Sequence, residues 1–309
     1  MPSNQSPLGA LPARFRRERV LVVGCGDVGL RCVKLLRGRA RLLALSSTPA
    51  RAPQLRAAGV TPLAGNLDEP RTIARLAGIA GRVLHLAPPA APSEGEWWRD
   101  LRTLNLARAL RRRSLPLSLT YASTTGVYGD CAGAMVSEAR PVHPGTPRAQ
   151  RRVDAERIVR HLGHAGVRAS VLRIPGIYAP DREGGTPRER LLRRTPVLRA
   201  EDDVYTNHIH ADDLARAVVA AMWRGKPQRI YNASDDSVLK MGDYFDLAAD
   251  LYGLSRPPRV PRSTAQDELP LMLLSFMSES RRLDNARLKN ELRVRLRHPT
   301  PATGLLSIR

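Results

Sequence analysis

Short apolar runs alternate with segments of helical spacing along the first 175 residues. Five mostly apolar runs predict buried strands, and they lie at 19–26, 40–46, 81–87, 115–123 and 168–174. The segments between them carry apolar residues every three or four positions, at 27–38, 53–59, 70–78, 96–113 and 147–163. This alternation predicts an α/β fold, with a doubly wound parallel sheet and helices on both of its faces.

The pattern changes near residue 175, where glycine and proline become denser and the alternation loosens. We therefore expect three parts. Residues 1–17 would be a disordered basic tail, 18–175 the main α/β domain, and 176–309 mostly a smaller C-terminal substrate lobe. The apolar segment 229–234 is expected to return one strand from this lobe to the sheet.

The composition is typical of a globular protein. Hydrophobic residues make up 42% of the chain and charged residues 26%. Because no apolar run approaches the ~18 residues that span a bilayer, we expect no membrane partner. The three cysteines, Cys25, Cys32 and Cys131, form no CxxC pair, and this favours reduced thiols in the cytoplasm.

The formal net charge of +21 is the strongest compositional signal. Lysine occurs only at four of the 50 basic positions, so the charge comes almost entirely from arginine. Such a charge attracts polyanions, yet no zinc-finger spacing or RNA-binding aromatic motif accompanies it, and aromatic residues are only 4%. Nucleic-acid binding is therefore a minor alternative, and an arginine-rich surface without a ligand is the other explanation.

A glycine-rich loop follows the first predicted strand. Gly24, Gly26 and Gly29 have G-x-G-x-x-G spacing, and Asp27 and Val28 open the following helix. In such a loop the first glycine allows a tight turn, the second lets the backbone approach a pyrophosphate, and the third lets helix and strand pack closely. The helix N-terminus then favours the anion. The strand–loop–helix context predicts a dinucleotide site in a Rossmann-type fold.

The second strand ends in "LALSSTPAR", where an NAD-binding protein usually carries a carboxylate for the adenosine ribose. This segment has Ser46, Ser47 and Arg51 and no acidic residue. Hydroxyls and a guanidinium suit a 2′-phosphate, because arginine grips phosphate with paired donors. We therefore favour NADP(H) over NAD(H). The alternative is that Arg51 is one of the many surface arginines.

Several further motifs occur in a consistent order: "AGNLDEP" (64–70), "HLAPP" (85–89), "ASTTGVYGD" (122–130), "LRIPGIYAP" (172–180) and "NHIHADDLARAV" (207–218). With these motifs the chain resembles the extended short-chain dehydrogenase/reductases, the NAD-dependent epimerase/dehydratase family, over nearly all of residues 18–309. The resemblance implies a homodimer through the helices 96–113 and 147–162. It also implies cofactor contacts at Asn66, Leu67, Leu86, Ala87, Pro88 and Pro175.

The family's catalytic Tyr-x-x-x-Lys pair is missing. The resemblance places Thr124 at the helper hydroxyl position, Arg148 where the tyrosine belongs, and Arg152 where the lysine belongs. No register shift restores the pair, because there is no tyrosine or lysine between Gly129 and Ile177. Arginine stays protonated, so neither side chain is an ordinary general base. Arg152 could hydrogen-bond the nicotinamide ribose, and Arg148 could stabilise a developing alkoxide.

The helix face offers two explanations for these arginines. Arg148 and Arg152 share a stripe with Ala155, Val159 and Leu162, which predicts that they face the sheet. Two like charges one turn apart then suit an anion between them, such as a phosphate or a substrate carboxylate. Alternatively, both side chains extend to solvent.

Other titratable residues give weaker signals. His143 precedes the helix and is one candidate proton source, with Tyr178 and water as others. In "HIHADD", Asp212 and Asp213 are expected as the cap and first turn of a helix, so we expect no metal site. The leading hypothesis is an atypical NAD(P)-binding oxidoreductase or epimerase-like protein acting on an unknown small carbonyl or sugar-type substrate. The alternative is a non-catalytic NADP(H)-binding sensor or partner protein.

Overall fold

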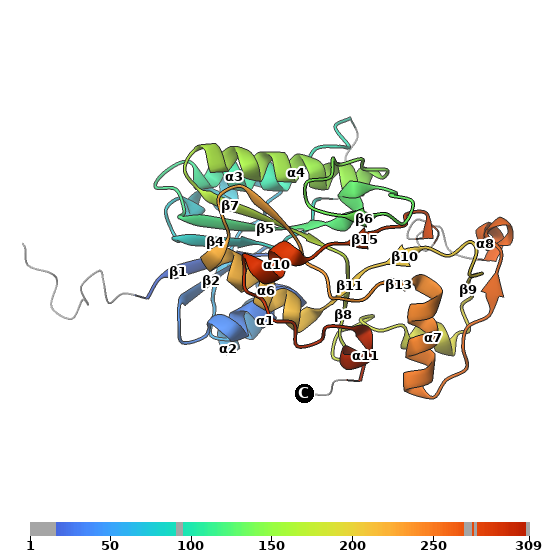
Figure 1. Cartoon of the computed structure of the whole chain (residues 1–309). Coiled ribbons are helices and arrows are strands. Elements are labelled where there is room, and N and C mark those ends of the chain that lie inside the picture. The colour runs from blue at the N-terminus through green and yellow to red at the C-terminus, as the bar shows by residue number, and fades with distance from the viewer. Residues whose placement is uncertain (1–16, 91–94, 269–273, 275–276, 307–309) are drawn as a thin grey trace, which may run out of the picture.

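The computed structural model describes residues 17–90, 95–268, 274 and 277–306 (Figure 1). The expected tail at 1–17 lies outside these residues, except for Arg17. A seven-stranded parallel sheet forms the centre of the molecule, in the order β12-β7-β5-β4-β1-β2-β3. Its strands are β1 (Arg19–Val23), β2 (Arg41–Ser46), β3 (Thr61–Ala64), β4 (Arg82–His85), β5 (Ser118–Thr124), β7 (Arg168–Ile174) and β12 (Arg229–Asn232). The prediction of an α/β fold with a doubly wound parallel sheet is confirmed.

The strand β1 shows why the sheet is covered on both faces. Its alternate residues Val20 and Val22 pack into one apolar core, and Leu21 and Val23 into the other. The first core contains side chains from α1 (Asp27–Leu36), α2 (Ala52–Ala57), α6 (Ala211–Arg224) and α10 (Ala286–Asn290). The second contains side chains from α3 (Leu101–Leu110) and α4 (Pro147–His164). Figure 1 shows α3 and α4 above the sheet and the other four helices below it.

Three predicted elements differ in the structure. The helix expected at 96–113 begins only at Leu101, because the Asp100 carboxylate caps it by accepting hydrogen bonds from the Arg102 and Thr103 N–H groups. The helix expected at 70–78 is a 3₁₀ helix, Pro70–Leu76. The cap of α6 is also not Asp212. His210 takes that position, since its Nδ1 accepts from the Asp212 N–H at 3.2 Å.

The second half of the chain contributes to two regions. The helix α6 covers the sheet, and β12 extends it beside β7. The remaining segments form a smaller lobe with its own apolar core, at the right of Figure 1. Its short elements are β8 (Gly176–Tyr178), α5 (Arg188–Leu192), β9 (Val197–Leu198), β10 (Tyr205–Thr206), β11 (His208–His210), β13 (Leu239–Lys240), α7 (Met241–Tyr252), β14 (Arg259–Val260), α8 (Arg262–Glu268) and α11 (Pro301–Gly304). The strands β6 (Met135–Val136) and β15 (Arg282–Leu283) pair with each other.

Candidate functional site

The glycine loop lies between β1 and α1, next to the point where the strand order reverses, which is where open α/β sheets bind ligands. Gly24 has φ +89°, and a Cβ there would lie 2.3 Å from the Ala87 nitrogen. A Cβ on Gly29 would lie 2.9 Å from the Gly24 carbonyl oxygen. Around Gly26, by contrast, a Cβ would meet nothing within 4 Å. Packing therefore requires glycine at positions 24 and 29, whereas Gly26 borders open space.

The N-terminus of α1 suits an anion at this open space. No side chain caps the helix at Gly26, and the first N–H groups of a helix lack partners inside it. Asp27 stands in this first turn, and its two carboxylate oxygens accept from Arg31 at 3.0 Å and from Arg182 at 2.8 Å. Because these ion pairs balance the Asp27 charge, the loop still fits the pyrophosphate of a dinucleotide.

Arg51 lies against the glycine loop. Its Nη2 donates to the Cys25 carbonyl oxygen at 2.7 Å, and the side chain is half-buried. Ser46 and Thr48 form a local turn, because the Ser46 hydroxyl accepts from the Thr48 N–H at 3.3 Å and donates to its carbonyl oxygen at 3.1 Å. Ser47 is exposed. The structure therefore places a cation between the end of β2 and the loop, and residues 46–51 contain no carboxylate.

The other predicted cofactor positions are on neighbouring strand ends. The N–H groups of Leu86 and Ala87 both donate to the Val23 carbonyl oxygen, at 2.7 and 3.0 Å, which holds the end of β4 against the loop. The carbonyl oxygen of Leu67 accepts from the Asn105 amide at 2.8 Å. The Asn66 N–H donates to the Thr72 hydroxyl at 2.9 Å. Pro88 is exposed, and Pro175 follows β7 directly.

Arg152 is buried and fastened to the sheet. Its Nη1 donates to the Ala122 carbonyl oxygen at 2.6 Å and to the Tyr121 hydroxyl at 3.1 Å. The side chain is 9% exposed, and its Nε has no hydrogen-bond partner within the described residues. The predicted inward stripe continues through Ala155 and Val159, which are fully buried. Arg152 therefore joins α4 to β5 under the end of the strand that carries Thr124.

Arg148 and Arg152 have different environments although they are one turn apart. Arg148 is exposed on the first turn of α4, so the inward-facing prediction is wrong for it and the solvent-facing alternative holds. The pKa of Arg148 is nevertheless below its usual value, since nearby atoms desolvate part of the guanidinium and Arg152 and Arg151 repel its charge. The Thr124 hydroxyl accepts from the Gly126 N–H at 3.3 Å, and its own proton remains available.

The structure narrows the choice of proton source. The Tyr128 hydroxyl is fully buried and donates to Asn232 at 2.7 Å. The Tyr178 hydroxyl donates to the Thr300 carbonyl oxygen at 3.1 Å, and burial raises the pKa of this phenol. His143 is exposed in the segment before α4. Both tyrosines therefore hold structural hydrogen bonds, and only His143 is open to solvent.

A buried ion pair supports the end of β5, and the sequence motifs did not reveal it. Arg173 on β7 donates to both carboxylate oxygens of Glu156 on α4, at 3.1 and 2.8 Å. Glu156 also accepts from the Ser123 hydroxyl at 2.6 Å. The two charged side chains are 4% and 6% exposed. Glu156 and Arg173 are 17 residues apart, so no local sequence motif indicates that they pair. The only sequence signal is the helical spacing, which places Glu156 on the inward face of α4.

A second buried cluster lies below Arg152. The His85 Nε2 is 2.8 Å from the Thr103 hydroxyl, and that hydroxyl donates to the Asp100 carboxylate at 2.7 Å. Burial, together with the nearby Arg152 charge, lowers the pKa of His85 to about 3, and burial raises the pKa of Asp100. The cluster therefore keeps a neutral imidazole beneath the site, so His85 is no base for a substrate.

The two acids of the segment "HIHADD" are paired with arginines. Within the described residues, no group of three or more His, Cys, Asp or Glu side chains is placed to hold a metal ion. Asp212 pairs with Arg31 at 2.5 Å, and Asp213 accepts from Arg216 at 2.9 Å. Over the same residues, the structure contains no helix both long and apolar enough to cross a membrane.

Comparison with known proteins adds a family and a set of similar folds. The sequence model of the NAD dependent epimerase/dehydratase family matches residues 20–234. A functionally unknown conserved protein from Silicibacter pomeroyi DSS is 29% identical, with a TM-score of 0.73 over 93% of this chain and 96% of that one. The UDP-glucose 4-epimerase from Thermotoga maritima, solved with UDP-glucose, is 20% identical, with a TM-score of 0.74 and the same coverage. The RMD protein from Pseudomonas aeruginosa, solved with NADPH, is 20% identical, with a TM-score of 0.68 and the same coverage. A search of curated proteins gave no match.

Proposed function

Because the chain belongs to the NAD dependent epimerase/dehydratase family, we propose that it binds a nicotinamide dinucleotide at the glycine loop and acts as an oxidoreductase or epimerase-like enzyme. The substrate would be a small carbonyl or sugar-type molecule. The observation that carries this proposal is the loop itself, where Gly24 and Gly29 are closed by packing and Gly26 is open. A bound nicotinamide would give or take a hydride, and the residues around Thr124 would hold the substrate.

We favour NADP(H) over NAD(H) because of Arg51. Its guanidinium is within hydrogen-bond distance of the loop through Cys25, and the remaining N–H groups can reach a phosphate on the neighbouring ribose. No carboxylate stands among residues 46–51 to bind a free ribose diol. The solved structure of RMD, a protein of the same fold, contains NADPH.

The substrate side of the site consists of Thr124, Arg148 and His143. In this proposal the Thr124 hydroxyl donates to the substrate oxygen, and the Arg148 charge stabilises an alkoxide or holds an anionic group. The proton comes from His143 or from water, since Tyr128 and Tyr178 are engaged elsewhere. Arg152 is a positioning residue here, because it holds the backbone of β5 at Ala122.

A second candidate is a non-catalytic NADP(H)-binding sensor or partner protein. The contact between Arg152 and Ala122 favours it, because the residue at the family's lysine position uses its Nη1 to hold protein backbone. Both candidates suit a cytoplasmic protein. A homodimer through α3 and α4 is consistent with the exposed Trp97, Trp98 and Leu101 at the start of α3.

Calorimetric titration with NADPH and NADH at two salt concentrations tests the proposal. We expect NADPH to bind with Kd well below millimolar and several-fold more tightly than NADH. Absence of binding by both nucleotides would refute the cofactor site. Turnover of carbonyl substrates that is lost in Thr124→Val supports the enzyme, whereas binding without turnover supports the sensor. Association with DNA or RNA that falls steeply with salt would instead support the nucleic-acid alternative.

A further inference from the structure

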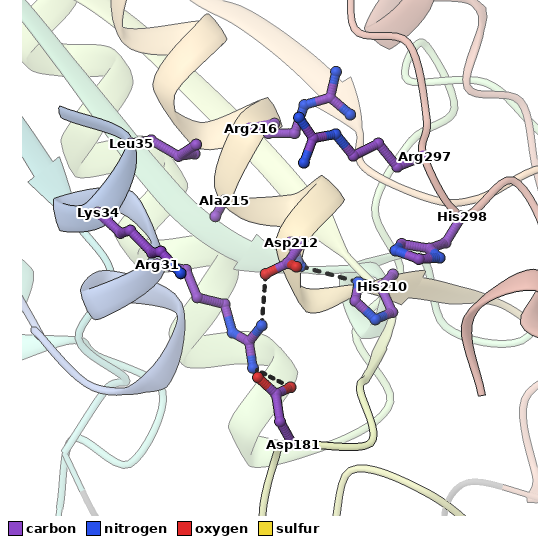
Figure 2. Close-up of a pocket in the computed structure, with 10 residues that line it drawn as sticks. All are labelled: Arg31, Lys34, Leu35, Asp181, His210, Asp212, Ala215, Arg216, Arg297 and His298. Carbon is purple, nitrogen blue, oxygen red and sulfur yellow. Dashed lines mark hydrogen bonds and ion pairs between the residues drawn. The ribbon is translucent and has the colours of Figure 1, made fainter. Parts of the chain in front are cut away.

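A cavity of about 540 Å³ lies away from the glycine loop, between α1, α6 and the C-terminal segment (Figure 2). The helix α1 contributes Arg31, Lys34 and Leu35, which share one face at i, i+3 and i+4. The other walls come from the loop after β8, from the start of α6 and from Arg297 and His298. None of the three loop glycines lines this cavity, so it is separate from the proposed dinucleotide site.

The charged lining is positive overall. Four cations and two carboxylates line the cavity: Arg31, Lys34, Arg216 and Arg297, with Asp181 and Asp212. Arg31 binds both of these carboxylates, at 2.7 and 2.5 Å, in addition to Asp27. Figure 2 shows the Arg31 guanidinium between Asp212 and Asp181. The four cations outnumber the two carboxylates, so the lining carries a formal net charge of +2, although Arg31 pairs with both acids.

Two of these cations have no side-chain partner among the residues that the structure describes. Arg216 is not one of them, because its Nη1 forms an ion pair with the Asp213 Oδ1 at 2.9 Å. The side chains of Lys34 and Arg297 make no hydrogen bond or ion pair to any part of the chain that the structure describes. They come from distant segments, since Lys34 is on α1 and Arg297 is in the C-terminal segment, and both line the cavity. Two unpaired cations that border one cavity suit a ligand with two negative charges.

His210 supplies a directional group. It is 3% exposed, and its Nδ1 accepts from the Asp212 N–H, so the proton of the neutral ring is on Nε2. Burial lowers the pKa of His210 to about 4, with the neighbouring His298 acting in the same direction. No described atom accepts the hydrogen bond of this buried Nε2. A buried donor without an acceptor costs free energy, and an acceptor atom on a ligand would remove that cost.

The rest of the lining is partly aromatic and apolar, and it offers a surface to the part of a ligand that carries no charge. His298 packs on His210 with ring centroids 3.9 Å apart, and its Nδ1 donates to the Thr303 carbonyl oxygen at 3.0 Å. The side chains of Leu35 and Ala215 add apolar atoms. From the unpaired cations, the orphan donor and this partly apolar wall, we propose that the cavity binds a small phosphate monoester. Its dianionic phosphate contacts Lys34, Arg297 and the His210 Nε2–H.

Titration calorimetry with glycerol 3-phosphate at constant ionic strength tests this site, using the full chain. We expect saturable binding at one site, with inorganic phosphate as a competitor. The double variant Lys34→Gln with Arg297→Gln should weaken binding at least tenfold. Both side chains are exposed and unpaired, so the variant should keep its Tm. Arg56→Gln is the matched control, because Arg56 is an exposed arginine on α2 outside the cavity.

A second variant isolates the buried donor. In His210→Asn the amide oxygen can still cap α6, but the Nε2–H is lost. We expect a tenfold loss of affinity with α-helical circular dichroism unchanged. Absence of binding to the wild type overturns the proposal. So does binding that survives the Lys34/Arg297 double variant, since this would place the phosphate at another site such as the glycine loop.

Discussion

The Arg152 guanidinium donates a hydrogen bond of 2.6 Å to the Ala122 carbonyl oxygen, and this contact fixes α4 to β5. The same nitrogen donates to the Tyr121 hydroxyl at 3.1 Å. The long, planar guanidinium thus reaches from the helix to the backbone of the strand. The arginine therefore contributes to the stability of the fold as well as to the shape of the site.

We expect Arg152→Gln to lower the free energy of unfolding by about 1–3 kcal/mol, because the Ala122 carbonyl and the Tyr121 hydroxyl lose a buried donor. Denaturant unfolding followed by circular dichroism measures this. Arg157→Gln on the same helix is the control, since Arg157 is exposed and its change should stay within about 0.5 kcal/mol. Equal stability of the two variants would contradict the structural role of Arg152.

The buried pair of Glu156 and Arg173 gives a larger effect. We expect Glu156→Gln to cost about 3–5 kcal/mol, because it leaves the Arg173 charge buried without a partner. The matched control is Glu189→Gln, whose ion pair with Arg193 is 3.8 Å long and more than three-quarters exposed. That pair is worth about 0–1 kcal/mol. Thermal unfolding of both variants under identical conditions should separate them by many degrees, and a similar Tm for the two would refute the buried pair.

The sheet and the glycine loop could be predicted from the sequence because their signals are local. Apolar runs gave the strands, and the spacing of Gly24, Gly26 and Gly29 gave the loop. Helix ends were less predictable. The helical spacing extended through Trp97 and Trp98, but α3 begins after Asp100, because the Asp100 carboxylate accepts two backbone hydrogen bonds there. The spacing of apolar residues alone does not show which residue caps the helix.

Contacts between distant segments could not be predicted at all. Glu156 meets Arg173 only after β7 is placed beside β5, and Arg297 meets the α1 face only after the C-terminal segment folds back. Arg148 is the opposite case. Its helical position was predicted correctly, but helical spacing alone did not separate its exposed side chain from the buried Arg152 one turn away.

Arg51 is expected to set the choice between the two nicotinamide cofactors. In the proposed site, Arg51→Gln should weaken NADPH binding about tenfold or more, because a charge-assisted contact with phosphate is lost. NADH binding should change little. Arg56→Gln removes the same charge from the neighbouring helix and should leave the NADPH-to-NADH ratio intact. Calorimetry measures all four affinities, and a ratio that is unchanged in Arg51→Gln would refute the role of Arg51.

Asp235 makes the stability depend on pH. It is 3% exposed, and burial raises its pKa to about 7 from its usual value of 3.8. Between about pH 4 and pH 7 the unfolded chain has lost this proton and the folded chain still holds it, so the folded state becomes less stable as the pH rises. Each pKa unit corresponds to about 1.4 kcal/mol.

We therefore expect Asp235→Asn to raise the Tm at pH 8 and to leave it nearly unchanged at pH 4. The asparagine oxygen can still accept from the Ser237 N–H and hydroxyl, as the Asp235 Oδ1 does at 3.0 and 2.6 Å. Glu183→Gln is the control, because Glu183 is an exposed acid in the same lobe. A gain in Tm of equal size at both pH values would contradict this prediction.

Alanine variants of the two loop glycines Gly24 and Gly26 should distinguish an effect on folding from an effect on cofactor binding. In Gly24→Ala the new Cβ clashes with the Ala87 backbone at 2.3 Å, and φ +89° is strained for alanine, so we expect a large loss of Tm. In Gly26→Ala the Cβ meets no atom within 4 Å, and φ −81° is allowed, so the Tm should hold. The same methyl group would stand where a pyrophosphate must approach the backbone. Calorimetry should then show a loss of NADPH affinity of about tenfold or more in a normally folded Gly26→Ala protein. Wild-type affinity in that variant would show that the dinucleotide does not bind at this loop.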